Sequence, residues 1–423
     1  MRGAPSQGAL LIENPELLAR VLAAPDDDEP RLVYADWLQE NGDEDRGELI
    51  VLQCEIARAE VAFRRPAASV VARERMLRTG IKATLVASVE AHVKRAWLER
   101  GFVERVWIPS AGFGAALAAV RATAPVRHVH VADAEPGWER EVACASALGS
   151  GLSLHLRGSP LGASSLAALL APGSSVLALR GLALHPPAGG LAEEGLACVA
   201  GAAFTGLREL EIRTRVGEGE ELGRLLRAPA LSGLERLSMC VAGAVDDVAV
   251  ELARAGGLTQ LRRLCVEAAL AWGAVLGDPG LQALASAPQL GPLVSFVARG
   301  TVLGSAGFAA VAEASFLEGL SELVLERALV TPRSAPPFRA SDVVPLLSSS
   351  RLGRLRHLDL SGYAVGREGA TAILASPYLA GLGQLDLQGC GVPRELQAAL
   401  RKRFGPGVCA FGEARGVRAS FPA

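Results

Sequence analysis

The residues of this chain that could perform chemistry are few and do not form a known catalytic signature. The sequence contains no G-x-x-x-x-G-K-[ST], no G-x-G-x-x-G between a strand and a helix, no H-E-x-x-H and no G-x-S-x-G. His128 and His130 lie two residues apart on an expected strand, so their side chains share a face and could belong to a zinc site. No nearby cysteine or carboxylate completes a ligand set. We therefore expect no metal, no cofactor, no small-molecule substrate and no enzymatic activity.

A repeated frame of apolar residues determines which elements position the remaining polar side chains. A degenerate copy of L-x-x-L-x-L begins at Leu293, and clear copies begin at Leu207, Leu234, Leu261, Leu320, Leu355 and Leu382. With the degenerate copy included, successive starts are separated by 27, 27, 32, 27, 35 and 27 residues. The segments 277–292, 304–319 and 366–381 align without gaps, each as a Gly-flanked turn and an Ala/Leu-rich helix. Each unit is therefore expected to be one strand and one helix.

The frame continues upstream in a weaker form. Residues 103–108 and 126–131 keep it, whereas 152–156 and 176–180 keep only its second half. We expect an array of about 11 strands that starts near Phe102, because one unit cannot bury its apolar strand face alone. Strands stack about 4.8 Å apart and helices are about 10 Å wide, so the stack must curve with its strands inside.

This pattern resembles the leucine-rich-repeat family, and the 27-residue helical repeat is similar to its ribonuclease-inhibitor-like class. The resemblance covers about 300 residues and implies a right-handed α/β solenoid, a horseshoe with a parallel inner sheet and outer helices. In that family an Asn or Cys at the ninth position hydrogen-bonds the turn backbone. Cys390 matches here, but the other copies carry Tyr363, Ala328, Ala269 and Ala242. Those turns must be held by other groups. A generic α/β sheet protein is the alternative.

The N-terminal part is expected to be a small all-α unit. Residues 1–65 carry 14 Asp/Glu against 7 Lys/Arg, and residues 66–105 carry 4 against 8. We expect the acidic head to lie against this basic connector, with binding of an anionic ligand by the connector as the alternative. Residues 14–62 read as three helices. The acidic run 26–29 is interpreted as a helix start, because it lacks the alternating oxygens and Gly turn of a calcium loop.

The same region carries a second resemblance. The run from Pro25 to Arg46, P-D-D-D-x-P-R-L-V-Y-A-D-W-L-x-E-x-G-D-x-x-R, is followed by Glu48, Ile50 and Gln53. It resembles the bacterial repeat-companion domain, although Gly47 and Leu49 stand where that family has Ala and an aromatic residue. The resemblance implies a modular, repeat-associated bacterial protein and no established activity. We expect Asp36, Arg31 and Arg46 to form an ionic cluster around Tyr34 and Trp37.

These observations predict four segments along the chain. They are a helical repeat-companion domain at 10–65, a helical connector and cap at 66–101, the solenoid at 102–402, and a terminal cap strand or tail at 403–423. The apolar stripe of the expected helix 81–99 is Ile81, Leu85, Val89, Val93 and Trp97, and it would cover the first strand of the solenoid.

Composition excludes several classes of function. The net charge of −2 argues against a protein that coats nucleic acid. Seven dispersed cysteines without a C-x-x-C pair indicate buried thiols in a reducing compartment. The N-terminal run does not resemble a signal peptide, and no apolar stretch reaches the length of a membrane span, so we expect a cytoplasmic protein with no membrane contact.

The concave strand face is the candidate binding surface. Outward-pointing positions of the frame give an aromatic, histidine and arginine patch typical of interfaces: Trp107, His130, His155, Arg157, Arg180, Arg213 and Glu211. Arg157, Arg180 and Arg213 are expected to stack on consecutive strands. We therefore predict a scaffold that binds a protein partner with an acidic surface. Solvated side chains that pair with Glu209 and Glu211 are one alternative, and a GTPase-activating role, by analogy with ribonuclease-inhibitor-like repeats, is the other.

Overall fold

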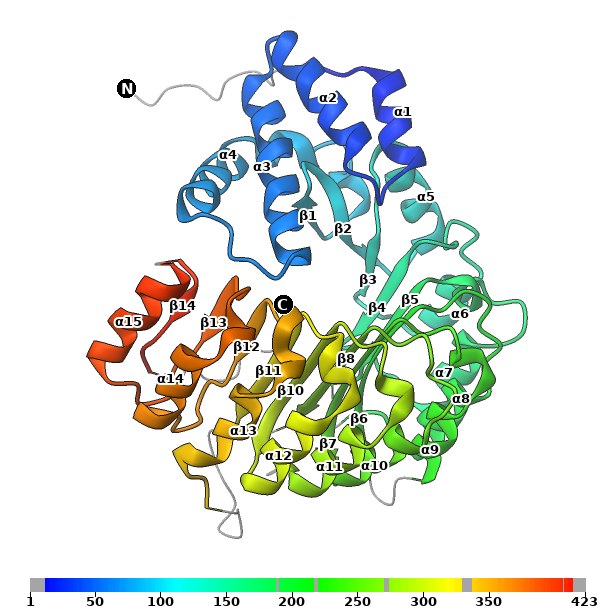
Figure 1. Ribbon diagram of the computed structural model, residues 1–423. Coiled ribbons are helices and arrows are strands. Elements are labelled where there is room, and N and C mark those ends of the chain that lie inside the picture. Colours follow the sequence, from blue (N-terminus) through cyan, green and yellow to red (C-terminus); the bar gives the residue numbers. More distant parts are fainter. Residues whose placement is uncertain are drawn as a thin grey trace, which may run out of the picture.

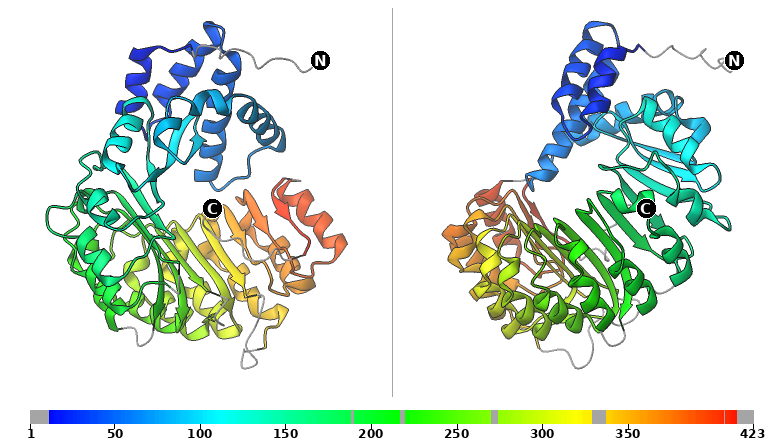
Figure 2. Two further views of the ribbon diagram at one scale, coloured as in Figure 1. Left: turned by 180° about the vertical axis from the view of Figure 1, so that it is seen from behind. Right: turned by 90° about the vertical axis from the view of Figure 1, so that its right-hand side faces the viewer.

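The chain forms one curved array of strands and helices that carries a helical unit at its N-terminal end (Figure 1). The computed structural model describes residues 12–187, 190–216, 220–269, 274–328, 337–405 and 407–413. Its strands follow one another through a single sheet in chain order. The strands line the concave side and the helices cover the convex side, which is the α/β leucine-rich-repeat solenoid expected from the frame (Figures 1 and 2).

The N-terminal unit contains the three expected helices and a longer fourth one. These are α1 (Pro15–Ala23), α2 (Glu29–Glu40), α3 (Glu44–Val61) and α4 (Ala68–Val86). The Asn14 side chain accepts hydrogen bonds from the backbone N–H groups of Glu16 and Leu17, and the Asp43 side chain accepts one from that of Arg46. These side chains satisfy N–H groups that have no partner inside a helix, so they define where α1 and α3 begin.

We expected a helix over residues 81–99, but helix α4 ends at Val86, so the prediction is wrong beyond that residue. A short 3-10 turn, η1 (Glu90–His92), follows α4, and β1 (Arg95–Glu99) then pairs antiparallel with β2 (Phe102–Pro109). A first strand without a neighbour would leave a row of unpaired N–H and C=O groups. A helix could cover the apolar side chains of the first repeat, but a strand also satisfies these backbone groups. The cap is therefore an antiparallel hairpin, backed by α4.

The remaining strands pair parallel to one another. They are β3 (His128–Ala132), β4 (Ser153–Arg157), β5 (Gly181–His185), β6 (Glu209–Val216), β7 (Arg236–Gly243), β8 (Arg263–Ala268), β9 (Leu276–Gly277), β10 (Ser295–Val302), β11 (Glu322–Arg327), β12 (His357–Asp359), β13 (Gln384–Asp386) and β14 (Cys409–Ala410). The short β9 pairs with β10 beside the main path. Frame leucines face inward on consecutive strands, for example Leu210 beside Leu237 and Leu237 beside Leu264.

One strand lies five residues later than expected. Residues 176–180, which we expected to be a strand, lie largely in a 3-10 helix, η2 (Ser175–Ala178), and β5 spans Gly181–His185. Leu182 pairs with Leu154 on one side and with Leu210 on the other. The frame in this repeat is therefore Leu179-x-x-Leu182-x-Leu184, and Ala183 takes the outward position beside His155.

The convex helices complete each repeat. They are α5 (Phe113–Thr123), α6 (Trp138–Ala143), α7 (Ala163–Leu169), α8 (Glu193–Ala200), α9 (Glu220–Leu226), α10 (Val245–Arg254), α11 (Asp278–Ala285), α12 (Ser305–Glu313), α13 (Val344–Leu347), α14 (Gly366–Ala375) and α15 (Arg394–Phe404). The helices expected within 277–292, 304–319 and 366–381 are confirmed as α11, α12 and α14. One apolar core runs without a break from Leu49 in α3 to Cys409 in β14. Each repeat thus buries its strand face against its own helix and its neighbours.

Some of the turns that lack an Asn or Cys are held by side chains from neighbouring repeats. Cys390 donates its S–H to the Leu360 carbonyl oxygen at 3.1 Å. The buried Tyr363 hydroxyl instead accepts the Leu303 N–H at 3.1 Å and bonds the Thr301 hydroxyl at 2.7 Å. Asp246 and Asp278, at the starts of α10 and α11, accept the N–H groups of Gly277 and Gly304 in the next repeat, each at 2.8 Å.

The N-terminal unit is packed against the first repeats. Phe102 of β2 belongs to the small apolar core of this unit, where its ring lies 5.6 Å from that of Tyr34. Arg31 of α2 forms a fully buried ion pair at 2.9 Å with Glu104 of β2. The expected cluster of Arg31 and Arg46 with Asp36 is therefore wrong, because Asp36 is exposed on the opposite face of α2.

The acidic run before α2 also faces the array. Asp28 pairs with Arg100 at 3.3 Å, and Asp26 pairs with Arg127 at 2.7 Å. The acidic head therefore meets the basic connector, as the charge pattern predicted, and it also reaches the first repeats of the solenoid.

Candidate functional site

An aromatic and histidine ladder crosses the N-terminal strands of the concave face. Trp107, His130 and His155 occupy the same register on β2, β3 and β4. The Trp107 and His130 rings stack with centroids 3.6 Å apart, and the His130 and His155 rings stack at 4.4 Å. Trp97 of β1 extends the ladder, with its ring centroid 4.2 Å from that of Trp107. The structure thus brings together three of the residues that we expected in the binding patch.

Burial determines the charge of this ladder. Burial and the nearby arginines lower the pKa of His128 to about 3 and that of His130 to about 2. Burial also lowers the pKa of His155 well below its usual value. The His128 Nδ1 lies 3.2 Å from the His155 Nε2, so one of the two neutral rings donates a hydrogen bond to the other. His130 is almost fully buried. The ladder is therefore mainly a packing feature at the base of the concave face.

The expected row of three arginines is interrupted. His185, not Arg180, is the β5 neighbour of Arg157. Arg180 precedes β5 and pairs with Asp26 of the N-terminal unit at 3.2 Å and with Glu209 at 3.5 Å. Its predicted place in the patch is wrong because the strand starts later than expected. Arg213 keeps its place on β6, beside Cys240 of β7.

Glu211 neutralises part of the positive charge in this region. Its carboxylate lies 3.2 Å from the Arg157 guanidinium and 2.6 Å from the His185 ring. The alternative to partner binding was that the arginines pair with Glu209 and Glu211. Arg157 is paired with Glu211 in this way.

A basic cavity lies next to the ladder. It has a volume of about 280 Å³, and its lining includes Arg105, Arg157, Arg236 and Arg263 together with Glu211. Arg105 pairs with Glu99 at 2.9 Å, and Arg236 lies 3.6 Å from Glu209. Arg263 forms no ion pair with any residue that the structure describes, and burial and the charge of Arg236 lower its pKa. Its positive charge is therefore the least compensated in the cavity.

The loop between α3 and α4, residues 62–67, reaches across the concave side to distant repeats (Figures 1 and 2). The Phe63 ring lies against the Arg263 guanidinium of β8, 5.6 Å from ring centroid to the central carbon. Arg65 forms an ion pair with Asp386 of β13. Residues 321 positions apart in the sequence therefore meet, and this loop, which we call the clasp, bridges the two ends of the array.

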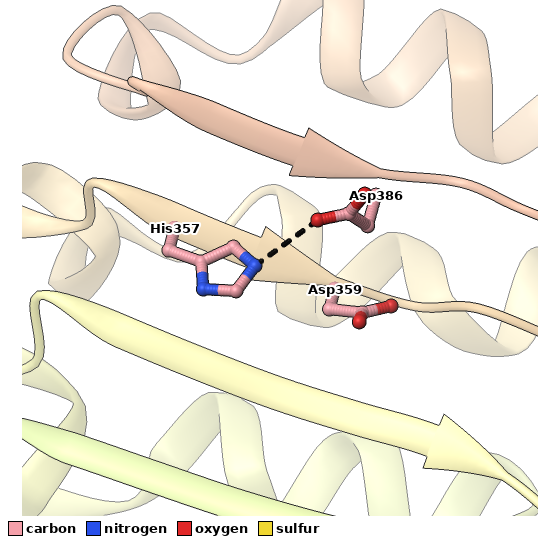
Figure 3. Close-up of side chains that lie close together, drawn as sticks. All are labelled: His357, Asp359 and Asp386. Atoms are coloured by element: carbon pink, nitrogen blue, oxygen red, sulfur yellow. Dashed lines mark hydrogen bonds and ion pairs between the residues drawn. The ribbon is translucent and has the colours of Figure 1, made fainter. Parts of the chain in front are cut away.

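A polar cluster lies where the clasp meets the C-terminal strands. His357 and Asp359 point to the same side of β12, and Asp386 lies beside Asp359 on β13 (Figure 3). The His357 Nδ1 lies 3.0 Å from a Glu322 oxygen, and its Nε2 lies 3.2 Å from an Asp386 oxygen. Burial alone would lower the pKa of His357, but the hydrogen bonds to Asp386 and Glu322 outweigh it and raise the pKa to about 9.

The neighbouring carboxylates differ in how they are compensated. Hydrogen bonds from His357 and Gln384 and the charge of Arg65 outweigh burial, so they hold the pKa of Asp386 well below its usual range. Asp359 accepts the Ser361 N–H at 2.8 Å and forms no ion pair within the described part of the chain. Burial accordingly raises the pKa of Asp359.

This cluster was not among the candidate binding residues expected from the sequence. His357, Asp359 and Asp386 stand at outward positions of two consecutive frames, LRHLDL and LGQLDL. Alignment of the two repeats places Asp359 beside Asp386, and this alignment is the signal that could have revealed the cluster. The contribution of Arg65 could not be found in this way, since it comes from outside the repeats.

Comparison with known proteins gives only distant likenesses. No protein-family model matches the sequence, and comparison with curated proteins gives no significant match. An internalin from Listeria monocytogenes aligns with 81% of this chain and 95% of its own, at 14% identity and a TM-score of 0.32. A leucine-rich-repeat protein from Leptospira interrogans aligns with 68% of this chain and 90% of its own, at 14% identity and a TM-score of 0.21. Likenesses this weak carry no information about what this chain binds. Within the described residues, no helix combines the length and apolar character needed to cross a bilayer.

Proposed function

We propose that this chain is a non-enzymatic scaffold that binds an acidic segment of a protein partner on its concave strand face. The observation that carries the proposal is the uncompensated Arg263 in a cavity whose lining contains four arginines and one carboxylate. A partly buried guanidinium that has no carboxylate partner is energetically unfavourable. A carboxylate of a bound protein can compensate its charge through charge-assisted hydrogen bonds. Trp107 and Arg157 would contact the partner at the edge of this site. Arg180 instead pairs with Asp26 of the N-terminal unit.

The organisation along the chain is part of the proposal. We propose that residues 10–65 form a repeat-companion domain, 66–101 a connector and cap, 102–402 the solenoid, and 403–423 the terminal cap. Residues 10, 11, 188, 189, 217–219, 270–273, 329–336, 406 and 414–423 of these segments lie outside the described residues. We also propose a cytoplasmic location, with seven unpaired cysteines as support.

The test measures binding of a fluorescein-labelled hexaglutamate peptide to the full chain by fluorescence anisotropy. We expect saturable binding that is absent with hexaglutamine and that weakens with added salt. The variant Arg263→Glu is expected to weaken binding at least about tenfold, which corresponds to a loss of about 1.4 kcal/mol. Lys402→Glu, on the outer helix α15, makes the same charge change away from the cavity and should leave binding unchanged. Equal affinity of Arg263→Glu and the unmodified chain for hexaglutamate would refute the proposal.

Once the peptide test succeeds, the partner can be sought by affinity capture with the unmodified chain and with Arg263→Glu side by side. A partner of the proposed kind is captured by the unmodified chain and by Lys402→Glu but is lost from Arg263→Glu.

A further inference from the structure

We propose that His357, Asp359 and Asp386 form a binding site for one zinc-class divalent metal ion, and that the ion competes with Arg65 of the clasp for Asp386. The site lies at the C-terminal end of the concave face, apart from the basic cavity, and the inference does not depend on the partner proposed above.

The first support is the geometry of the three side chains. One nitrogen or oxygen atom from each of them lies within 4.8 Å of the others. Zinc binds imidazole nitrogen and carboxylate oxygen at about 2.0–2.2 Å, so two ligand atoms on one ion are at most about 4 Å apart. Small side-chain rotations would therefore bring the set to bonding distance. The three side chains come from adjacent strands of the sheet, and β-sheet pairing holds their backbones in fixed register (Figure 3).

The second support is the orientation of the histidine. Glu322 of β11 lies 3.0 Å from the His357 Nδ1, and this contact leaves the Nε2 directed at Asp386. Histidine ligands of metal ions commonly donate their other ring N–H to a carboxylate, which fixes the ring and raises its basicity. Glu322 occupies that supporting position, and the Ser295 hydroxyl in turn hydrogen-bonds Glu322.

The third support is the charge balance. Glu322 is paired with His357, Glu326 with Arg299 at 3.1 Å, and Asp386 with Arg65. Asp359 has no such cation among the described residues, although it is mostly buried beside Asp386. A divalent ion between Asp359 and Asp386 would compensate both carboxylates.

Competition with the clasp follows from the shared ligand. The Arg65 guanidinium forms its ion pair with one carboxylate oxygen of Asp386, and the His357 Nε2 lies next to the other oxygen. An ion bound to Asp386 places two positive charges beside this guanidinium, so Arg65 must move away. The His357 ring binds through Nε2 as the neutral imidazole, so any proton on Nε2 is released to solvent when the metal binds.

The test uses the full chain without a histidine tag and Co²⁺ as the spectroscopic probe, with Zn²⁺ as the competitor. We expect visible Co²⁺ absorption bands that saturate at one ion per chain and disappear when Zn²⁺ is added. Asp359→Asn and His357→Gln should remove the bands, and Glu322→Gln should weaken binding about 10–100-fold. His155→Gln alters the other histidine cluster and should leave the bands unchanged. Thermal melts followed by circular dichroism confirm that each variant is folded.

The competition is tested with Arg65→Gln. Removal of the guanidinium should tighten Co²⁺ binding at least severalfold, and Zn²⁺ should speed hydrogen exchange of residues 62–67 in the unmodified chain. Bands that persist in the folded Asp359→Asn and His357→Gln chains, or no bands at all, would overturn the site. An Arg65→Gln chain with unchanged affinity would overturn the competition.

Discussion

At the scale of single residues, one group of buried charges lies between the N-terminal unit and the first repeats. Arg31 and Glu104 are both completely buried, and Arg100 makes a second ion pair with Glu104 at 3.0 Å. Burial raises the pKa of Glu104 although Arg31 and Arg100 act against it. Such pairs contribute little net stability, but removing one partner leaves an uncompensated charge in the interior.

The first prediction concerns Glu104. Glu104→Gln removes the only negative charge that contacts Arg31 among the described residues, so we expect the free energy of unfolding to fall by about 3–5 kcal/mol. Urea denaturation followed by circular dichroism measures this change. Glu395→Gln breaks an exposed ion pair with Arg367 and should leave the urea midpoint nearly unchanged. Equal midpoints for the two variants would contradict the prediction.

The second prediction concerns pH. The pKa of His130 in the folded chain is about 2, below its usual value of 6.5, so the unfolded chain takes up a proton that the folded chain does not. Stability is therefore full above about pH 6.5 and falls as the pH drops toward the folded pKa. His130→Phe keeps a ring in the stack and removes this proton. Its free energy of unfolding should fall less steeply between about pH 6 and 4, by up to about 1.4 kcal/mol per pH unit.

Urea titrations of both chains at a series of pH values test the second prediction. His92→Phe, which lies outside the stack, provides the control and should follow the unmodified chain. Parallel pH profiles for His130→Phe and the unmodified chain would show that His130 does not contribute.

At the scale of the elements, each repeat depends on how its turn is closed. In the repeat after β12, the Tyr363 hydroxyl replaces the Asn or Cys of the usual pattern and reaches back two strands, to Leu303 and Thr301. The aromatic ring also packs edge-on against Phe308, with centroids 5.1 Å apart. One side chain therefore links the repeat of β12 to the repeat of β10 through both packing and hydrogen bonding.

The third prediction follows from this link. Tyr363→Phe keeps the packing but leaves the buried Leu303 N–H without its acceptor, so we expect a loss of about 1–3 kcal/mol in unfolding free energy. Tyr378→Phe removes a hydroxyl from a partly exposed ring and should have little effect. Thermal or urea unfolding of both variants measures the difference. A loss as large in Tyr378→Phe as in Tyr363→Phe would rule out a special role for the buried hydroxyl.

At the scale of the whole molecule, the clasp closes an otherwise open array. Phe63 has a φ of 52°, a left-handed conformation that is strained for an aromatic residue. The contacts with Arg263 and Asp386 stabilise the loop in this conformation. Arg263 lines the basic cavity, and Asp386 belongs to the His–Asp cluster. The clasp contacts both residues, so it lies between the two candidate sites.

The fourth prediction tests this closure. Arg65→Glu places a carboxylate opposite Asp386, so we expect repulsion to release the clasp and the two ends of the array to separate. Small-angle X-ray scattering should then show a larger radius of gyration, and residues 62–67 should exchange hydrogen faster. Arg75→Glu makes the same change on the exposed side of α4 and should leave both measurements unchanged. A scattering profile identical to that of the unmodified chain would mean that packing of the N-terminal unit alone maintains the shape.

The repeat architecture and the helices of the N-terminal unit could be predicted from the amino-acid sequence. Both depend on local periodicity, because a frame residue such as Leu237 must face the core wherever its strand lies. Helix starts at Asn14 and Asp43 were readable for the same reason, since a cap acts within three residues of its own position.

The choice of the segment that forms β5, and the placement of Trp97 on a strand, could not be predicted from the sequence because both depend on contacts between strands. Residues 176–180 and 181–185 both alternate in a strand-like way, and the choice between them depends on pairing with Leu154 and Leu210. The ion pair between Arg65 and Asp386 likewise joins the N-terminal unit to the last repeats. Arg65 therefore compensates a carboxylate of the His–Asp cluster from a loop that is far away in the sequence. Local periodicity holds no information about such contacts, because they arise from the accumulated curvature of all the repeats between them.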